Sequence, residues 1–155
     1  MSIYARNTDV SSGRTKEEIE KTLMRYGATG FAYGWQGDKA VIGFSLADRM
    51  MRFDLPLPDR ASKEFTHTPT GRNRRDMDSQ HKEWEQACRQ RWRALALVIK
   101  AKLEAVHSDI TTVEEEFLAH IVMPNGKTFG EWARPQIQQS YKNKRMPPLL
   151  GAMTE

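Results

Sequence analysis

The sequence has only one cysteine, Cys88, among its 155 residues, so it cannot form an internal disulfide. Structural disulfides belong to oxidising compartments, and their exclusion favours a reducing cytoplasm. No apolar run reaches the roughly 20 residues that a membrane-spanning helix needs. The first ten residues, MSIYARNTDV, lack the basic and then apolar order of a secretory signal. We therefore expect a cytoplasmic protein with no membrane partner.

Motifs for catalysis and metal binding are also missing. There is no GxSxG nucleophile motif, no CxxC pair and no HxxxH pair. His81 with Glu85, and Glu116 with His120, are spaced four residues apart, but a metal site needs three or four ligands. We expect no metal, no cofactor and no enzymatic activity.

Cations are plentiful and unevenly placed. The net charge is +4 and the isoelectric point is about 9.3. Residues 87–103 hold five cations and residues 133–154 hold four, and neither stretch contains an acid. A basic stripe attracts polyanions such as nucleic acid, although a solvated helix face can also be basic.

A helix followed by three strands is predicted for the first third of the chain. Thr15 can cap the helix, Glu18 completes a capping box, and Gly27 ends it in the left-handed conformation. Residues 1–12 are expected to be flexible. Alternating apolar residues then predict strands at about 31–35, 40–46 and 50–55, with turns between them.

The glycines of these strands could cradle a phosphate or could serve packing. A phosphate-binding loop places its glycines between a strand and the start of a helix, whereas these lie within strands. Packing is therefore favoured, and the small residues define one face of the sheet. Either a helix packs on that face or a small ligand such as a nucleotide lies on it. The residues are Ala32, Gly34, Gly43 and Ser45.

Residues 58–80 are polar and without period, which predicts a mobile basic loop. Such a loop can close over an anionic partner, or it can be a neutral insertion. Residues 80–107 then follow a helical period with one apolar face. This apolar face consists of Trp84, Cys88, Trp92, Leu95, Ile99, Leu103 and Val106. It predicts that Cys88 and the two tryptophans of the stripe, Trp84 and Trp92, are core residues.

The last third predicts three small elements. A short helix is capped near Thr111 or Thr112, Asn125-Gly126 marks a hairpin, and residues 134–145 form a terminal helix before the tail 146–155. The fold class is α+β, with residues 1–155 as one domain. A three-stranded antiparallel meander is packed by the long helix and the N-terminal helix, with the small hairpin and the C-terminal helix added.

Several stretches resemble a group of small uncharacterised proteins of tailed phages and prophages: RTKEEIEKTLMRYGATGFAYG, RWRALALVIKAKLEAV and EEEFLAHIVMPNGKTFGEW. The resemblance covers most of the chain and implies a phage-related role in the host cytoplasm, with no activity attached. A more distant similarity lies in the order helix, antiparallel meander, long basic helix, which resembles the core of Rad52-type single-strand annealing proteins. That similarity implies a role in recombination, with basic side chains holding the DNA backbone.

These observations predict a non-catalytic nucleic-acid-binding accessory protein, with single-strand binding or annealing as its most concrete form. Tyr33 and Trp35 could stack on bases if they point outward, although a place in the core is favoured. The main alternative is a protein-binding module, such as a phage inhibitor of a host defence system, and a homo-oligomer is also possible. The candidate nucleic-acid-binding residues are Arg52, Arg72, Arg74, Arg75, Arg89, Arg93 and Lys100.

Overall fold

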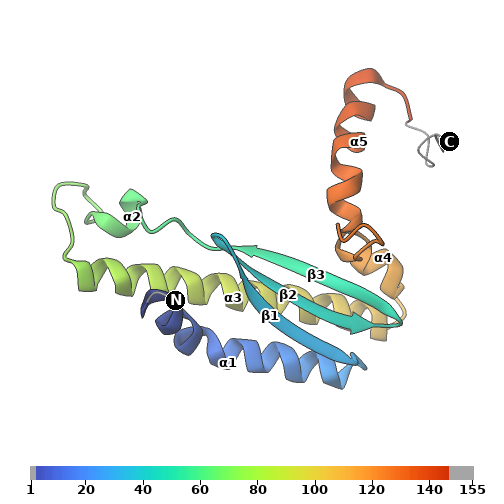
Figure 1. Ribbon diagram of the computed structural model, residues 1–155, viewed down its shortest axis with the longest axis horizontal. Coiled ribbons are helices and arrows are strands. Elements are labelled where there is room, and N and C mark those ends of the chain that lie inside the picture. The colour runs from blue at the N-terminus through green and yellow to red at the C-terminus, as the bar shows by residue number, and fades with distance from the viewer. Residues whose placement is uncertain (1–2, 147–155) are drawn as a thin grey trace.

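The computed structural model describes residues 3–146, and the side chains of residues 13–146. Helix α1 (Ile3–Arg25) leads into strands β1 (Gly30–Gln36), β2 (Lys39–Leu46) and β3 (Arg49–Pro56). The short helix α2 (Lys63–Thr66) precedes the long helix α3 (Met77–His107). Helix α4 (Val113–Phe117), the 3-10 turn η1 (Leu118–His120) and helix α5 (Phe129–Asn143) complete the chain (Figure 1). The fold is α+β, as the sequence predicts.

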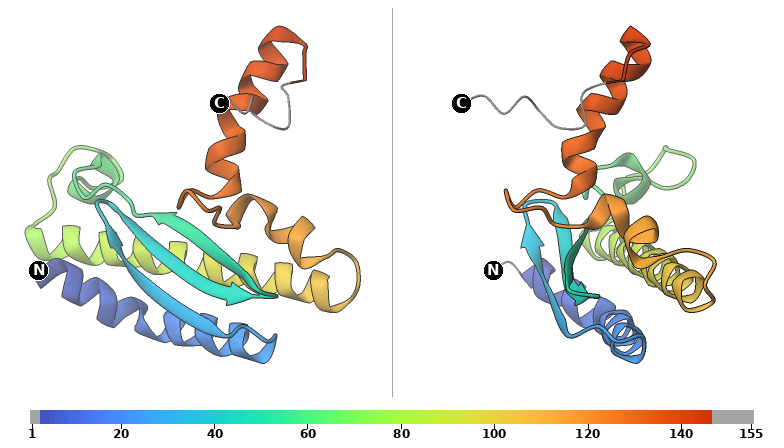
Figure 2. Two further views of the ribbon diagram at one scale, coloured as in Figure 1. Left: turned by 45° about the vertical axis from the view of Figure 1, so that its right-hand side comes forward. Right: turned by 90° about the vertical axis from the view of Figure 1, so that its right-hand side faces the viewer.

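The sheet is an antiparallel meander in the order β1-β2-β3. Helices α1 and α3 lie side by side on one of its faces, and the opposite face is left open along most of its length (Figure 2). The two hairpin turns differ in chemistry. Gly37 takes the left-handed conformation in the first, whereas Ala47 and Asp48 take it in the second, at φ of 50° and 58°. The turns and the three strands therefore confirm the predicted meander.

The main core lies between the sheet and the two helices. The even positions of β2 and the odd positions of β3 face the helices, because side chains alternate along a strand. The predicted stripe of α3 packs against them, and Phe44, Phe53 and Phe117 meet ring to ring. The buried members are Ile19, Leu23, Ala40, Ile42, Phe44, Leu46, Met51, Phe53, Leu55, Trp92, Leu95, Ile99, Leu103 and Phe117.

A smaller cluster joins α2 to the first half of α3. Trp84 and Cys88 are buried against Phe65, and the Trp84 indole donates to the Pro58 carbonyl at 2.8 Å. Burial raises the pKa of the Cys88 thiol to about 11, so this side chain is a protonated, buried apolar group at neutral pH. The predicted core positions of Cys88 and both tryptophans are confirmed.

Two helix starts and the content of one segment differ from the expectation. Helix α1 begins at Ile3, so Thr15 lies inside the helix and caps nothing. Helix α5 begins at Phe129, five residues before the predicted start, because Thr128 and Glu131 form a capping box there. The segment 58–80 holds a helical turn and a bridge between His67 and Arg74, so it is not free of regular structure. Most of the predicted tail, 147–155, lies outside the described residues.

The hairpin predicted at Asn125-Gly126 is reduced to a tight turn. Gly126 has the left-handed conformation, and the amide of Met123 donates to the Lys127 carbonyl at 2.8 Å. Only single bridges flank the turn, one from Val122 to Thr128 and one from Ile121 to Met51. The second bridge attaches this turn to the edge of β3, and it thereby sets the point from which α5 leaves the body.

Candidate nucleic-acid interface

Four exposed cations share one side of α3, and we call Lys82, Arg89, Arg93 and Lys100 the basic face. Their spacings of seven, four and seven residues return to the same side of an α-helix. The face therefore runs about 27 Å along the helix, at 1.5 Å per residue. Lys82 was not among the predicted residues, but the seven-residue spacing from Arg89 could have identified it.

The basic face carries little internal neutralisation. Arg89 donates to the neutral Gln86 amide oxygen at 2.9 Å. Within the described side chains of residues 13–146, no ion pair within 4.0 Å involves a residue of this face. These charges therefore remain available to an anionic partner.

The other cations of the stretch 87–103 have structural partners. Arg91 donates to the Pro56 carbonyl at 2.8 Å, which ties α3 to the end of β3. Lys102 pairs with Glu116 at 3.1 Å, which ties α3 to α4. The cations of the acid-free stretch therefore fall into two groups: Arg91 and Lys102 bind other elements, whereas the outward-facing Arg89, Arg93 and Lys100 have no ion pair within the part of the chain whose side chains are described.

The segment before α3 divides in the same way. Arg72 and Arg74 are exposed on a tight turn that the Thr68 carbonyl closes by accepting from the Gly71 amide at 2.7 Å. Arg75 is instead an anchor, because its guanidinium donates to the Glu64 carbonyl at 2.9 Å. Arg72 and Arg74 therefore extend the supply of free cations beyond the N-terminal end of α3, and Arg75 does not.

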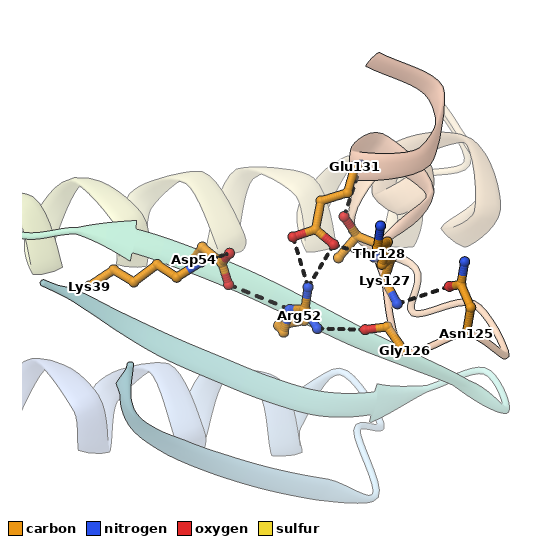
Figure 3. Close-up of polar contacts among 8 residues, drawn as sticks. All are labelled: Lys39, Arg52, Asp54, Asn125, Gly126, Lys127, Thr128 and Glu131. Carbon is orange, nitrogen blue, oxygen red and sulfur yellow. Dashed lines mark hydrogen bonds and ion pairs between the residues drawn. The ribbon is translucent and has the colours of Figure 1, made fainter. Parts of the chain in front are cut away.

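Arg52 lies on the opposite face of the sheet from α3, so the seven predicted residues do not share one side. Its guanidinium bonds both oxygens of Glu131, at 3.0 and 2.9 Å, and donates to the Gly126 carbonyl at 2.8 Å (Figure 3). The Oδ1 atom of Asp54 lies 3.5 Å from the Nε atom of Arg52. Arg52 is thus a largely neutralised clamp between β3 and the start of α5.

The electrostatics of this clamp are consistent with that role. The Thr128 backbone hydrogen bond, followed by the charge of Arg52, holds the pKa of Glu131 below its ordinary value. Glu131 therefore stays ionised at neutral pH and keeps Arg52 occupied. Lys39 completes the network by pairing with Asp54 at 2.8 Å.

Tyr33 and Trp35 lie on the helix-covered side of the sheet, since they pair with Ile42 and Ala40. They are nevertheless 48% and 37% exposed, because β1 is an edge strand. The ammonium of Lys16 lies 4.4 Å from the centre of the Tyr33 ring, and this contact occupies one ring face. The structure therefore places these aromatics at a partly covered edge, not within the core.

The face with small residues remains open in this chain. A methyl group added at Gly34 would meet no atom within 4 Å, and at Gly43 the nearest atom is the Met51 carbonyl oxygen at 3.7 Å. Of the two alternatives for this face, a packed helix is absent from the described part of the chain. A shallow hollow of about 620 Å³ occupies the place, and residues of all three strands line it, among them Met50 and Arg52 of β3.

Two kinds of feature are absent from the described residues. They contain no group of three or more His, Cys, Asp or Glu side chains that could hold a metal ion. They also contain no helix that is both long and apolar enough to span a bilayer. Comparison of the chain with protein-family models, curated proteins and solved structures finds no match.

Proposed function

We propose that this chain is a phage or prophage accessory protein that binds nucleic acid without catalysis. The contact surface is the basic face of α3 together with Arg72 and Arg74. The observation that carries the proposal is a row of exposed cations along about 27 Å of α3, a helix that is anchored in the core, and among the side chains of residues 13–146 these cations have no ion-paired partner.

Phosphate backbones match this surface in chemistry and in reach. They offer a repeating negative charge, and cations that neutralise phosphates give affinity without reading any base. The core holds the backbone of α3, so the points from which these side chains extend are fixed before binding, and the ordering cost is confined to the side chains themselves. Single-strand binding or annealing is the most concrete form of this function. It is supported by the order of helix, meander and long basic helix, which resembles the Rad52-type core.

The test is fluorescence anisotropy with labelled single-stranded and duplex oligonucleotides over a salt series. Six phosphate contacts give a slope of log affinity against log salt of roughly −5 for duplex DNA, and somewhat less for a single strand. Arg89→Ala with Arg93→Ala removes two contacts and should reduce the slope by about 1.8. The matched control, Lys21→Ala with Lys127→Ala, has the same net charge and alters exposed cations elsewhere.

The turn before α3 is tested separately with Arg72→Ala and Arg74→Ala. Arg75 stays unchanged, because its removal would release the segment from Glu64 and confuse the result. Equal slopes for the α3 variant and its control would contradict the proposal. If only the variant with Arg72→Ala and Arg74→Ala showed reduced affinity and a smaller slope, the interface would lie at the turn and not on α3.

A protein partner on the open sheet face is the second candidate function. The hollow of about 620 Å³ and the 51% exposure of Met50 favour it, because protein interfaces are enriched in methionine and centred on desolvated apolar groups. A host defence protein would be one such partner. Binding through this face should change little with salt, and Gly34→Arg should abolish it while leaving nucleic-acid affinity intact.

A further inference from the structure

Helix α5 stands away from the body as a helix without a core of its own (Figures 1 and 2). None of its residues, Phe129–Asn143, is buried. It is nevertheless amphipathic, because every fourth residue along one side is apolar or small: Phe129, Ala133, Ile137 and Tyr141. Ile137 is 56% exposed and Tyr141 is 84% exposed. An apolar side of this length on a projecting helix is a surface that a partner would cover.

The same side of α5 forms one wall of a groove. The groove measures about 650 Å³, and its other wall is η1 with the end of α4. Gly130 brings the two walls together, since a methyl group there would lie 2.9 Å from the Ala119 carbonyl oxygen. The apolar lining consists of Leu118, Ala119, Phe129, Ala133 and Ile137. The two walls are therefore in close contact at Gly130, at the base of α5.

The base of the groove carries charges of both signs. Lys102 pairs there with Glu116 at 3.1 Å, and Arg134 lines the wall formed by α5. Glu115 is exposed and accepts hydrogen bonds from the Thr111 hydroxyl at 3.2 Å and the Thr112 amide at 3.4 Å, but it makes no ion pair within 4.0 Å among the described side chains, residues 13–146. The tip of α5 carries Lys142, Lys144 and Arg145, and no acid follows Glu131 until the last residue of the chain. A helix that entered the groove in the antiparallel direction would place a basic tip beside Glu115. The second copy of this chain supplies such a helix.

We propose that two copies pair through α5, with each α5 lying antiparallel in the groove of the other. A two-fold axis near Ile137 places residue 133 of one copy opposite residue 141 of the other. The large Tyr141 side chain of each copy then fills the space above the small Ala133 of the other copy, so the two-fold axis gives two such contacts. The basic tip of each copy reaches Glu115 of its partner. A two-fold interface requires one patch that is complementary to itself, and the apolar stripe, with Glu115 at the base and the basic tip at the far end, meets that requirement.

The first experiment is sedimentation velocity of the full chain over a concentration series. The wild type should shift toward twice its mass of 17.9 kDa as concentration rises. Ile137→Asp should remain a monomer, because it places a charge at the two-fold axis. Gln139→Asp adds the same charge on the far side of α5 and should dimerise like the wild type. Circular dichroism confirms that both variants keep their helices.

The second experiment tests the register. Ile137→Cys brings two thiols together at the axis, and oxidation with copper phenanthroline should give a covalent dimer, whereas Gln139→Cys should not. The buried Cys88 does not interfere. A wild type that stays monomeric at every concentration overturns the pairing. Association that Ile137→Asp leaves intact, or equal cross-linking of the two cysteine variants, overturns it as well.

Discussion

Helices α3 and α5 carry similar amphipathic patterns, yet they have opposite relations to the rest of the molecule. The apolar stripe of α3 is covered by the sheet and by α1, and its cations face solvent. Among the described residues, the apolar stripe of α5 faces only η1 and the end of α4, at its base, and no residue of the helix is buried. The same sequence pattern thus builds the core in one place and an available surface in the other. The difference lies in what the chain places against each helix.

The largest expected effect comes from a comparison of two substitutions that shorten an aliphatic side chain to alanine. Leu103→Ala removes a side chain that is 2% exposed in the core, and it should lower the free energy of unfolding by about 2–5 kcal/mol. Ile137→Ala removes one that is 56% exposed, and it should change the value by no more than about 0.5 kcal/mol in the monomer. Urea denaturation at low protein concentration measures both. Similar losses for the two variants would mean that α5 is packed far more tightly than its exposure indicates.

A smaller effect should separate two glycines. Helix propensity alone would make Gly130→Ala stabilising by about 1 kcal/mol. The contact at 2.9 Å with the Ala119 carbonyl should reverse that sign and cost about 1–3 kcal/mol, because backbone cannot move aside cheaply. Gly34→Ala, where the added methyl group meets nothing within 4 Å, should be close to neutral. Thermal unfolding compares the pair, and a stabilised Gly130→Ala variant would show that α5 is free to shift on η1.

The smallest effect concerns the joint between the two regions. Burial lowers the pKa of His120, whose ring stacks on Phe53 at 3.8 Å. The unfolded chain binds this proton more readily, so stability should be lost as pH falls below about 6.5, by at most about 1.4 kcal/mol per pH unit. His120→Phe keeps the stacking and removes the proton, so it should flatten the curve between pH 7 and 5. Asp76 and Glu131, whose pKa values are also lowered, titrate below that window.

The parts that sequence predicted were those set by local periodicity. The stripe of α3 and the alternation of β2 and β3 followed directly from spacing, and Gly27 ends its helix in the left-handed conformation as expected. Local signals also misled. Thr15 and Glu18 have the spacing of a capping box within an unbroken helix, while the true box at Thr128 and Glu131 was hidden by the hairpin pattern and by Pro135.

The roles of the arginines could not be predicted from local periodicity, because each role depends on a partner that is distant in the sequence. Arg52 meets Glu131, 79 residues away, and Arg75 meets the Glu64 carbonyl, 11 residues away. Neither contact has a sequence signature, so both arginines were grouped with the free cations. Arg72, Arg74, Arg89, Arg93 and Lys100 stay candidates, since the described side chains give them no ion pair within 4.0 Å.

Arg52 belongs to two regions at once, because it lines the hollow on the open sheet face and also clamps the first turn of α5. An anion bound in the hollow would compete with Glu131 for this one guanidinium. Anion binding there would then weaken the anchoring of α5, and the two equilibria would affect each other by the same factor. Through the side chain of Arg52, the position of α5 would then depend on whether the hollow on the sheet is occupied.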